Sequence, residues 1–311
     1  MKIYSNIESF TRVKKPVLTS GTFDGVHIGH KAIVNRINEI ADKIGGESVL
    51  LTFEPHPRKV LFPGNDDLRL LSTLQEKIAL LEKTGLQHLI FYPFSMEFSR
   101  LSALDYVRNL LVNGIGVHTM VVGYDHHYGR NREGNFAQLI EFSQTYGFEV
   151  QEIPAQEIND INVSSTKVRN ALIEGDLQVA NLYLGYNYQL SGTVEHGNAL
   201  GRQIGFPTAN LQILDKNKLI PADGVYAVMA EIHGVKHEAM LNIGTRPTLE
   251  NEGKRSIEVH IMNFDREIYN ETLTLELHYR IRNELRFPSI DELKAQLLID
   301  QSTAKELLKE A

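Results

Sequence analysis

The chain has 311 residues, of which 42% are hydrophobic and 23% are charged, and this is the balance of an ordinary globular protein. That length suffices for two domains, and that composition excludes disordered, collagen-like and coiled-coil proteins. Acidic residues outnumber basic ones by 39 to 32, and the net charge of −7 is spread over both halves. General nucleic-acid binding needs a basic excess, so we expect no nucleic-acid partner. Any anionic substrate must be held by a few placed cations.

The chain contains no cysteine, which excludes disulfides, thiolate catalysis and cysteine-ligated zinc. No run approaches the roughly 18 apolar residues that would cross a membrane. The first ten residues, MKIYSNIESF, lack the basic-then-apolar order of a signal peptide. We therefore expect a cytoplasmic protein with no membrane partner.

From Lys15 to about Leu184, short β-branched runs alternate with longer amphipathic runs. The predicted strands are Val17–Ser20, Ser48–Phe53, His88–Pro93, Met120–Gly123 and Glu149–Ile153. The predicted helices are His30–Ile44, Thr73–Thr84, Ala103–Asn113 and Asn135–Tyr146. This alternation predicts an α/β domain in which helices cover both faces of a parallel sheet. Ligands of such sheets bind at the carboxyl ends of the strands.

Beyond Gly185 the pattern changes to short alternating strands separated by turn signals. The predicted strands are Tyr188–Glu195, Gly224–Ile232, His237–Asn242, Ser256–Ile261 and Thr272–Ile281. They indicate an antiparallel barrel or sandwich. A last amphipathic helix, Ile290–Glu310, follows Pro288 and Ser289.

The segment GTFDGVHIGH, from Gly21 to His30, lies between the first apolar strand and a helix. Its glycines permit close approach of backbone to a ligand, and the helix start offers free N–H groups to a phosphate. His27 and His30 are three residues apart, so both imidazoles face one side of the first turn. There they can stabilise charge that develops on a phosphorus centre. A surface or metal-binding pair is the alternative, but no third ligand is evident nearby.

A second segment, VSSTKVR from Val163 to Arg169, places three hydroxyls and two cations at a helix start. The hydroxyls of Ser164, Ser165 and Thr166 can cap the helix or bind anionic oxygens. Lys167 and Arg169 can neutralise a departing pyrophosphate. Taken alone, the segment would be better explained as a plain helix cap with solvated charges.

Several motifs together resemble the prokaryotic bifunctional riboflavin kinase/FAD synthetase family. In the first half these are GTFDGVHIGH, TFEPHP (Thr52–Pro57), VVGYDHHYGRNREGN (Val121–Asn135) and VSSTKVR. In the second half they are GTVEHGNALGRQIGFPTANL (Gly192–Leu211), PADGVYAV (Pro221–Val228), NIGTRPT (Asn242–Thr248) and IEVHIMNFD (Ile257–Asp265). The resemblance covers essentially the whole chain, in family order.

The resemblance implies a Rossmann-like nucleotidylyltransferase domain, 1–184, followed by a riboflavin kinase domain, 185–311. The second domain would be a six-stranded antiparallel β-barrel with a terminal helix. The implied substrates are riboflavin, FMN and ATP, and the implied metal is Mg²⁺. The two reactions would be phosphorylation of riboflavin to FMN and adenylylation of FMN to FAD with release of pyrophosphate.

In the adenylyl site the resemblance makes His27, His30 and Arg169 catalytic. Nucleotide contacts would come from Gly21, Phe23, Asp24, Gly25, Asp125, Ser164, Ser165, Thr166 and Lys167. Where the family often has an acidic or amide residue and then Phe-x-Phe-Gly, this chain reads Asp125-His126-His127-Tyr128-Gly129, with His126 replacing an aromatic residue.

In the kinase site the resemblance makes Glu258 the catalytic base, and strand alternation places His260 on the same face. Thr208 and Asn210 would serve Mg²⁺ and the ATP phosphates, which suits an ion that keeps few protein oxygens. Nucleotide contacts would come from Gly197, Gly201, Arg202 and Gly205 in a glycine loop that is no Walker A motif. Arg282 would contact flavin, although a cation at a strand edge explains it nearly as well.

Two alternatives remain beside the bifunctional enzyme. A related nucleotidylyltransferase with another acceptor would share the HxGH turn but would lack the PTAN barrel. An adenylyltransferase whose barrel mainly binds or senses flavin predicts loss of Glu258 or Thr208, and both are present. The sequence leaves oligomerisation open.

Overall fold

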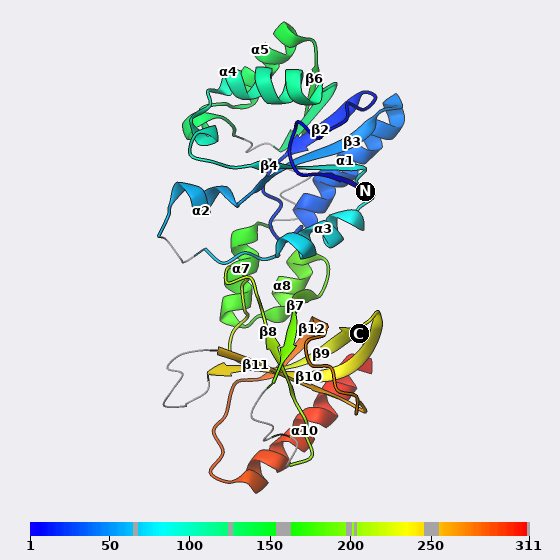
Figure 1. Ribbon diagram of the computed structural model, residues 1–311, viewed down its shortest axis with the longest axis vertical. Helices are drawn as coiled ribbons and strands as arrows, with labels where there is room; N and C mark the ends of the chain where they lie inside the picture. The colour runs from blue at the N-terminus through cyan, green and yellow to red at the C-terminus, as the bar shows by residue number, and fades with distance from the viewer. Residues whose placement is uncertain are drawn as a thin grey trace. The chain divides into compact units, whose positions relative to one another are not determined.

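The computed structural model describes residues 1–64, 68–123, 127–153, 163–196, 201, 204–245 and 255–309 (Figure 1). The chain divides into two compact units, of which the first comprises Met1–Arg69 and Lys77–Ser164. The second comprises Leu70–Glu76 and Ser165–Ala311. The units thus divide near residue 164, whereas the predicted catalytic domains divide at residue 184, and that catalytic division stays a prediction.

The first unit contains a parallel sheet with the strand order β1-β4-β3-β2-β5-β6. Its strands are β1 (Lys2–Tyr4), β2 (Pro16–Ser20), β3 (Glu47–Glu54), β4 (His88–Pro93), β5 (Thr119–Gly123) and β6 (Glu149–Ile153). The five predicted strands are confirmed, and the three-residue edge strand β1 was too short to give an alternating pattern. β2 lies between β3 and β5 and is buried throughout. The segment that follows it therefore begins at the carboxyl ends of the strands, near the centre of the sheet.

Helices cover both faces of this sheet, as predicted (Figure 1). One core cluster joins Leu18, Leu51 and Val122 of the sheet to Leu111 and Leu139 of the helices on that side. Alternate strand residues face the other side, where α1 packs against β2, β3 and β5.

The helices and short helical turns of this unit are α1 (Ile28–Ile44), α2 (Pro57–Leu61), α3 (Leu74–Glu82), η1 (Phe98–Arg100), α4 (Ala103–Asp105), η2 (Tyr106–Ile115), η3 (Arg130–Arg132) and α5 (Phe136–Tyr146). The helix predicted at Ala103–Asn113 therefore exists, but it widens into π-helical turns from Tyr106. α1 ends at Gly45, whose φ of 62° is the left-handed conformation that glycine adopts at little cost.

The second unit is built on a closed barrel with the strand order β10-β11-β8-β7-β12-β9, all pairs being antiparallel. Its strands are β7 (Tyr188–Glu195), β8 (Ala209–Gln212), β9 (Gly224–Ile232), β10 (Val235–Thr245), β11 (Arg255–Ile261) and β12 (Thr272–Arg282). The expected six-stranded barrel is confirmed. Sequence reasoning missed β8 as a strand, because its four residues, which follow Pro207 and Thr208, are too few to give a clear alternation.

The terminal helix α10 (Ile290–Lys309) packs against the barrel through Ala304 and Leu308, which join Phe206 and Met240 in one core cluster. Asp300 lies one turn before Ala304 and is also buried. The predicted helix is therefore confirmed, and it presents one mixed apolar and acidic face to the barrel.

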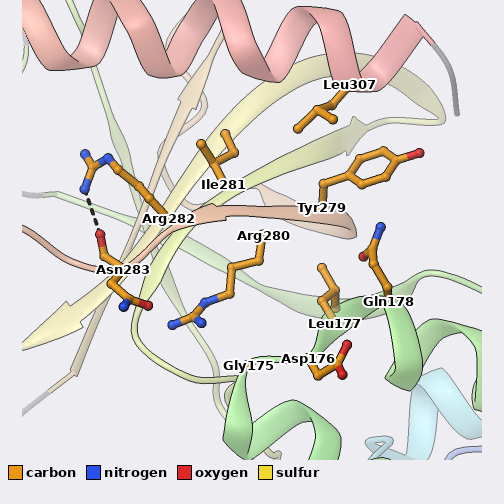
Figure 2. Close-up of a pocket in the computed structure, with 10 residues that line it drawn as sticks. All are labelled: Gly175, Asp176, Leu177, Gln178, Tyr279, Arg280, Ile281, Arg282, Asn283 and Leu307. Atoms are coloured by element: carbon orange, nitrogen blue, oxygen red, sulfur yellow. Dashed lines mark hydrogen bonds between the residues drawn. The ribbon is translucent and has the colours of Figure 1, made fainter.

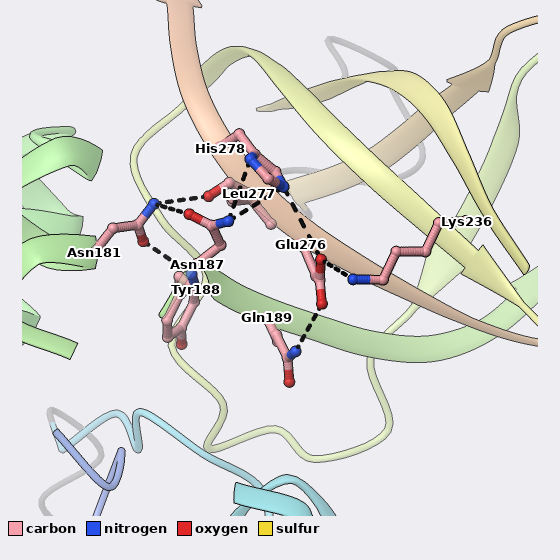
Figure 3. Close-up of polar contacts among 8 residues, drawn as sticks. All are labelled: Asn181, Asn187, Tyr188, Gln189, Lys236, Glu276, Leu277 and His278. Atoms are coloured by element: carbon pink, nitrogen blue, oxygen red, sulfur yellow. Dashed lines mark hydrogen bonds and ion pairs between the residues drawn. The ribbon is translucent and has the colours of Figure 1, made fainter. Parts of the chain in front are cut away.

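Two helices precede the barrel, α7 (Ser165–Glu174) and α8 (Leu177–Leu184), and polar contacts fasten α8 to it (Figure 3). Asn181 donates to Asn187 Oδ1 at 3.1 Å and to the Leu277 carbonyl at 2.9 Å, and it accepts from the Tyr188 amide at 2.9 Å. Along β12, Glu276 pairs with Lys236 at 2.7 Å. The contacts of Asn181 explain why α8 belongs to the barrel unit.

A short segment from the first half of the sequence, Leu70–Glu76, also belongs to the barrel unit. Leu70 bonds through its backbone to Asn217 and Leu219, at 2.6 and 2.8 Å. Lys218, only 3% exposed, donates to the Leu71 carbonyl at 2.7 Å and to Glu76 Oε2 at 2.6 Å. We call this segment the strap.

Candidate active sites

The turn between β2 and α1 carries the predicted adenylyl residues Gly21, Phe23, Asp24, Gly25 and His27. Phe23 and Asp24 are buried at 2% exposure, and Gly21 donates its amide to the Leu51 carbonyl at 3.1 Å. The backbone has positive φ at Phe23 (48°), Gly25 (77°) and Val26 (37°). A non-glycine residue rarely adopts such φ values, and strain of this kind gathers where a site needs a special backbone shape.

The two histidines lie side by side, as their spacing predicts. The His27 and His30 rings stack with centroids 3.7 Å apart, and Phe23 stacks on the other face of His30 at 4.6 Å. His27 Nδ1 accepts from the His30 amide at 3.4 Å and caps α1, so the proton of neutral His27 is on Nε2.

His30 is held in its uncharged form by its surroundings. Burial lowers the pKa of His30 well below 6.5, and the neighbouring His27 and Lys77 lower it further. Its Nδ1 is buried and has no hydrogen-bond partner among the described residues. A neutral imidazole with an unused nitrogen is ready to bond to a ligand.

The second predicted motif begins beside this turn. A Cβ added to Gly29 of α1 would lie 3.4 Å from Val163 Cγ1, so Val163 packs next to the HxGH segment in the first unit. α7 begins at Ser165, which confirms the predicted helix start. Ser165, Thr166, Lys167 and Arg169 belong to the second unit, and their part in the adenylyl site stays a prediction. Asp125, Gly197 and Arg202 lie outside the described residues.

The barrel contains a cavity of about 620 Å³ that brings together Gly201, Thr208, Glu258 and Arg282. Glu258 and His260 both line it, as alternation along β11 predicts, while Ile257, Val259 and Ile261 are buried. Asn210 on β8 and Asn242 on β10 stand opposite Glu258 in the strand register. The Glu258 carboxylate thus lies between two amide residues in the strand register, at the wall of a cavity that Glu284 also lines.

The turn before β8 holds the predicted metal residue Thr208, which is exposed to the cavity. The Gly201 carbonyl accepts from the Phe206 amide at 2.8 Å, and an added Cβ at Gly201 would collide with the Phe206 carbonyl. Gly205 has a φ of 88°, which explains a glycine at that position.

His260 is hydrogen-bonded to the backbone of this turn. Its Nδ1 donates to the Pro207 carbonyl at 2.8 Å, and its Nε2 accepts from Gln301 of α10 at 3.3 Å. Burial lowers the pKa of His260, although the bond to Pro207 opposes that shift. The imidazole is therefore neutral and has one defined tautomer.

Arg282 is part of the cavity wall, but its guanidinium is already engaged. Its Nε and Nη2 donate to Asp300 at 3.0 and 2.7 Å, and Asp300 is 1% exposed. A bidentate pair of this kind fixes the planar group. Flavin contact by Arg282 stays a prediction.

Sequence reasoning missed the apolar part of the cavity. Ile204 and Phe206 line one part of it, Leu285 and Phe287 come from the segment between β12 and α10, and Leu293 comes from α10. The signal available was the apolar pair in RIRNELRF together with the face of the terminal helix. It also missed Lys77, a buried lysine that precedes Leu80 and Leu81 by three and four residues and so shares their helix face.

A second hollow, of about 480 Å³, lies between the α7–α8 turn and β12 (Figure 2). Arg280 points across it towards Gly175 and donates to the Asp223 carbonyl at 2.6 Å. A Cβ at Gly175 would lie 2.5 Å from Arg280 Nη1. Arg280 therefore connects β12 to the backbone of Asp223 and lies against Gly175.

Within the described part of the chain, no group of three or more His, Asp or Glu side chains is arranged to hold a metal ion. No helix in that part combines the length and the apolar character needed to cross a membrane.

Known proteins resemble the chain over nearly its whole length. A family model described as FAD synthetase matches residues 10–167, and one described as riboflavin kinase matches residues 184–308. A bifunctional riboflavin kinase/FMN adenylyltransferase of Pseudomonas fluorescens is 38% identical over 94% of this chain and 92% of its own length. The protein of that name from Escherichia coli K12 is 36% identical over 98% of this chain and 97% of its own. The crystal structure of a macrolide-efflux protein from Streptococcus pneumoniae gives a TM-score of 0.86 at 30% identity, over 98% of both chains.

Proposed function

We propose how each site works in this chain, which belongs to the family of bifunctional riboflavin kinases/FMN adenylyltransferases. The chain is an enzyme that phosphorylates riboflavin with ATP to give FMN and ADP. It also adenylylates FMN with a second ATP to give FAD and pyrophosphate. Residues 1–184 carry the adenylyl transfer and residues 185–311 the kinase reaction.

The kinase assignment rests on one observation, the position of Glu258 at the wall of a cavity that is apolar on one side. The 5′-hydroxyl of riboflavin is a weak nucleophile, and a base must take its proton as phosphorus is attacked. The Glu258 carboxylate accepts that proton. The apolar residues Phe206, Leu285 and Phe287 suit the flat isoalloxazine ring, which gains from leaving water.

The oxygen donors beside Glu258 fit Mg²⁺. Thr208 and Asn210 offer neutral oxygens, and Mg²⁺ in phosphoryl-transfer sites takes few protein ligands because the phosphates supply most of its charge. When bound, Mg²⁺ would supply positive charge against the charge on the transferred group. In this chain Thr208 and Asn210 would hold the ion, Gly201 and Gly205 would let backbone approach the phosphates, and His260 fixes the turn that carries Thr208.

The adenylyl site poses a different chemical problem. The FMN phosphate is already an anion, so it needs alignment with the α-phosphate of ATP and donors for the developing charge, but no base. The stacked pair His27 and His30 supplies those donors at the first turn of α1. Gly21 and Gly25 let backbone approach the nucleotide, while Ser164, Ser165 and Thr166 bind its oxygens. Arg169 and Lys167 neutralise the departing pyrophosphate.

One experiment tests both assignments. The protein is incubated with riboflavin, ATP and Mg²⁺, and riboflavin, FMN and FAD are separated by chromatography over time. We expect FMN to form first and FAD to follow, with each reaction stopping when Mg²⁺ is chelated. FAD formation only from supplied FMN would instead favour an adenylyltransferase whose barrel binds flavin without phosphorylating it.

A further inference from the structure

Lys77 is a buried lysine that the proposed chemistry does not use. It lies in α3, belongs to the first unit and is 5% exposed. Its Nζ donates to the Thr22 carbonyl at 3.0 Å. Thr22 lies inside the turn between β2 and α1, so a cation on another element holds the backbone of the adenylyl site.

That backbone needs to be held. Phe23 and Val26 both have positive φ, and Val26 is β-branched, for which this conformation is especially unfavourable. Such residues persist only where surrounding contacts fix them. The Thr22 carbonyl receives a second bond, from Thr52 Oγ1 at 3.2 Å, and Thr52 is fully buried. Lys77 and Thr52 thus form a two-donor clamp on one carbonyl.

The charges around Lys77 concern the same turn. Burial lowers the pKa of Lys77, whereas the nearby carboxylates of Asp24 and Glu54 favour its charged form. Without the ammonium, these two carboxylates would repel the polyphosphate of ATP. The ammonium also disfavours a proton on His30, which lies against His27 and Phe23.

We propose that Lys77 is a positioning residue for adenylyl transfer, because its ammonium fastens the Thr22 carbonyl and so aligns the turn that presents His27 and His30. The inference rests on the proposed role of these histidines and extends it to a residue on α3. Small misplacements of reacting groups cost up to about 100-fold in rate. The effect should therefore fall on kcat for FAD formation more than on KM.

The test compares Lys77→Met, which keeps the length and loses the charge, with Lys77→Arg and with Lys83→Met. Lys83 is exposed just after α3 and serves as the matched control. With FMN and ATP supplied, we expect Lys77→Met to lose about 10- to 100-fold in kcat, with a smaller change in KM. Lys77→Arg should recover part of the loss, and Lys83→Met should match the wild type. Riboflavin phosphorylation by the same preparations should be unchanged and reports that the protein is folded.

A pH measurement separates positioning from mere support of the fold. Removing a cation that disfavours imidazolium should raise the pKa of His30, so the acid limb of FAD formation should move to higher pH in Lys77→Met. NMR titration of the imidazole protons of His30 gives the same shift without any turnover, and therefore tests the inference even if the wild type makes no FAD. Should Lys77→Met fail to fold, Thr52→Val removes the other donor and should lower kcat in the same direction by a smaller factor.

Wild-type kcat and an unshifted His30 titration in Lys77→Met would overturn the inference. Equal losses of adenylyl and kinase activity in a folded Lys77→Met protein would overturn it too. Absence of FAD formation by the wild type would instead count against the proposed function.

Discussion

The two sites differ in how much of their chemistry is buried. At the adenylyl turn, Asp24 and His27 are almost wholly covered, the backbone is strained, and a clamp of two donors holds one carbonyl. At the kinase cavity, Thr208 is exposed and Glu258 half-buried, whereas the supporting His260 is covered. The difference matches the nucleophiles: an anionic phosphate needs preorganised donors, whereas a hydroxyl needs an accessible base.

The largest expected effect is on the kinase site alone. Glu258→Gln keeps the shape of the side chain and removes its basicity, so phosphorylation of riboflavin should fall by about 10²–10⁴-fold. Conversion of supplied FMN to FAD should remain close to wild type in the same chromatographic assay. Equal loss of both activities in a folded protein would contradict the assignment of two separate sites.

The reverse separation should follow from the histidines. Replacing His27 or His30 by alanine removes a donor to developing phosphate charge and should slow FAD formation by about 10²–10³-fold. Riboflavin phosphorylation serves as the internal control and should not change. Unaltered FAD rates in both variants would leave the pair as structural histidines.

The stability of the protein should also depend on pH through His30. Because the pKa of His30 lies well below 6.5, unfolded His30 binds a proton at a pH where native His30 does not. The unfolded state then binds more protons, so the free energy of unfolding should fall as the pH drops below 6.5. Denaturant titrations of the wild type and His30→Ala at several pH values should show a weaker pH dependence in the variant.

A smaller effect is expected at the metal turn. Thr208→Val keeps the β-branched shape and removes one oxygen, so kinase activity at limiting Mg²⁺ should fall by at least about tenfold. Added Mg²⁺ should restore part of it, and FAD formation from FMN should be unaffected. Normal phosphorylation at limiting Mg²⁺ would show that Thr208 only shapes the turn.

The smallest effect should come from α10. Gln301→Ala removes the partner of His260 Nε2 but leaves the bond to Pro207, and one such neutral bond contributes about 1 kcal/mol. Kinase kcat should fall by about two- to fivefold. Exposed Lys309→Ala on the same helix is the matched control and should behave as the wild type.

Local spacing predicted the parts of the sites that depend on local geometry. Three-residue spacing placed His27 and His30 together, and strand alternation placed Glu258 and His260 on one face. Pairings between distant residues could not be predicted in this way. Arg282 was predicted to contact flavin, with a cation at a strand edge as the alternative, and neither prediction identified its partner Asp300 on a separate helix.

Lys77 and the strap show the same limit. A lysine within QEKIALLE is usually solvated, and its burial follows only from how α3 packs near the turn after β2. The pairing of Leu70 with Asn217 and Leu219 joins residues far apart in the sequence, and no periodicity signals it. Tertiary context decides such contacts.

The strap bears on the evolution and dissection of the enzyme. A fragment that starts at residue 185 would contain every strand of the barrel but would leave out Leu71 and Glu76, which accept hydrogen bonds from Lys218. The Lys218 ammonium would then lose the Glu76 carboxylate, and breaking a buried ion pair by removing one partner costs about 3–5 kcal/mol. An excised kinase should therefore need a peptide covering residues 70–76, or an apolar residue at 218, to regain the stability of the parent. The seven residues Leu70–Glu76 come from the first half of the sequence but belong to the barrel unit. Recombination at the boundary between the two catalytic domains would therefore separate them from the barrel and lower its stability.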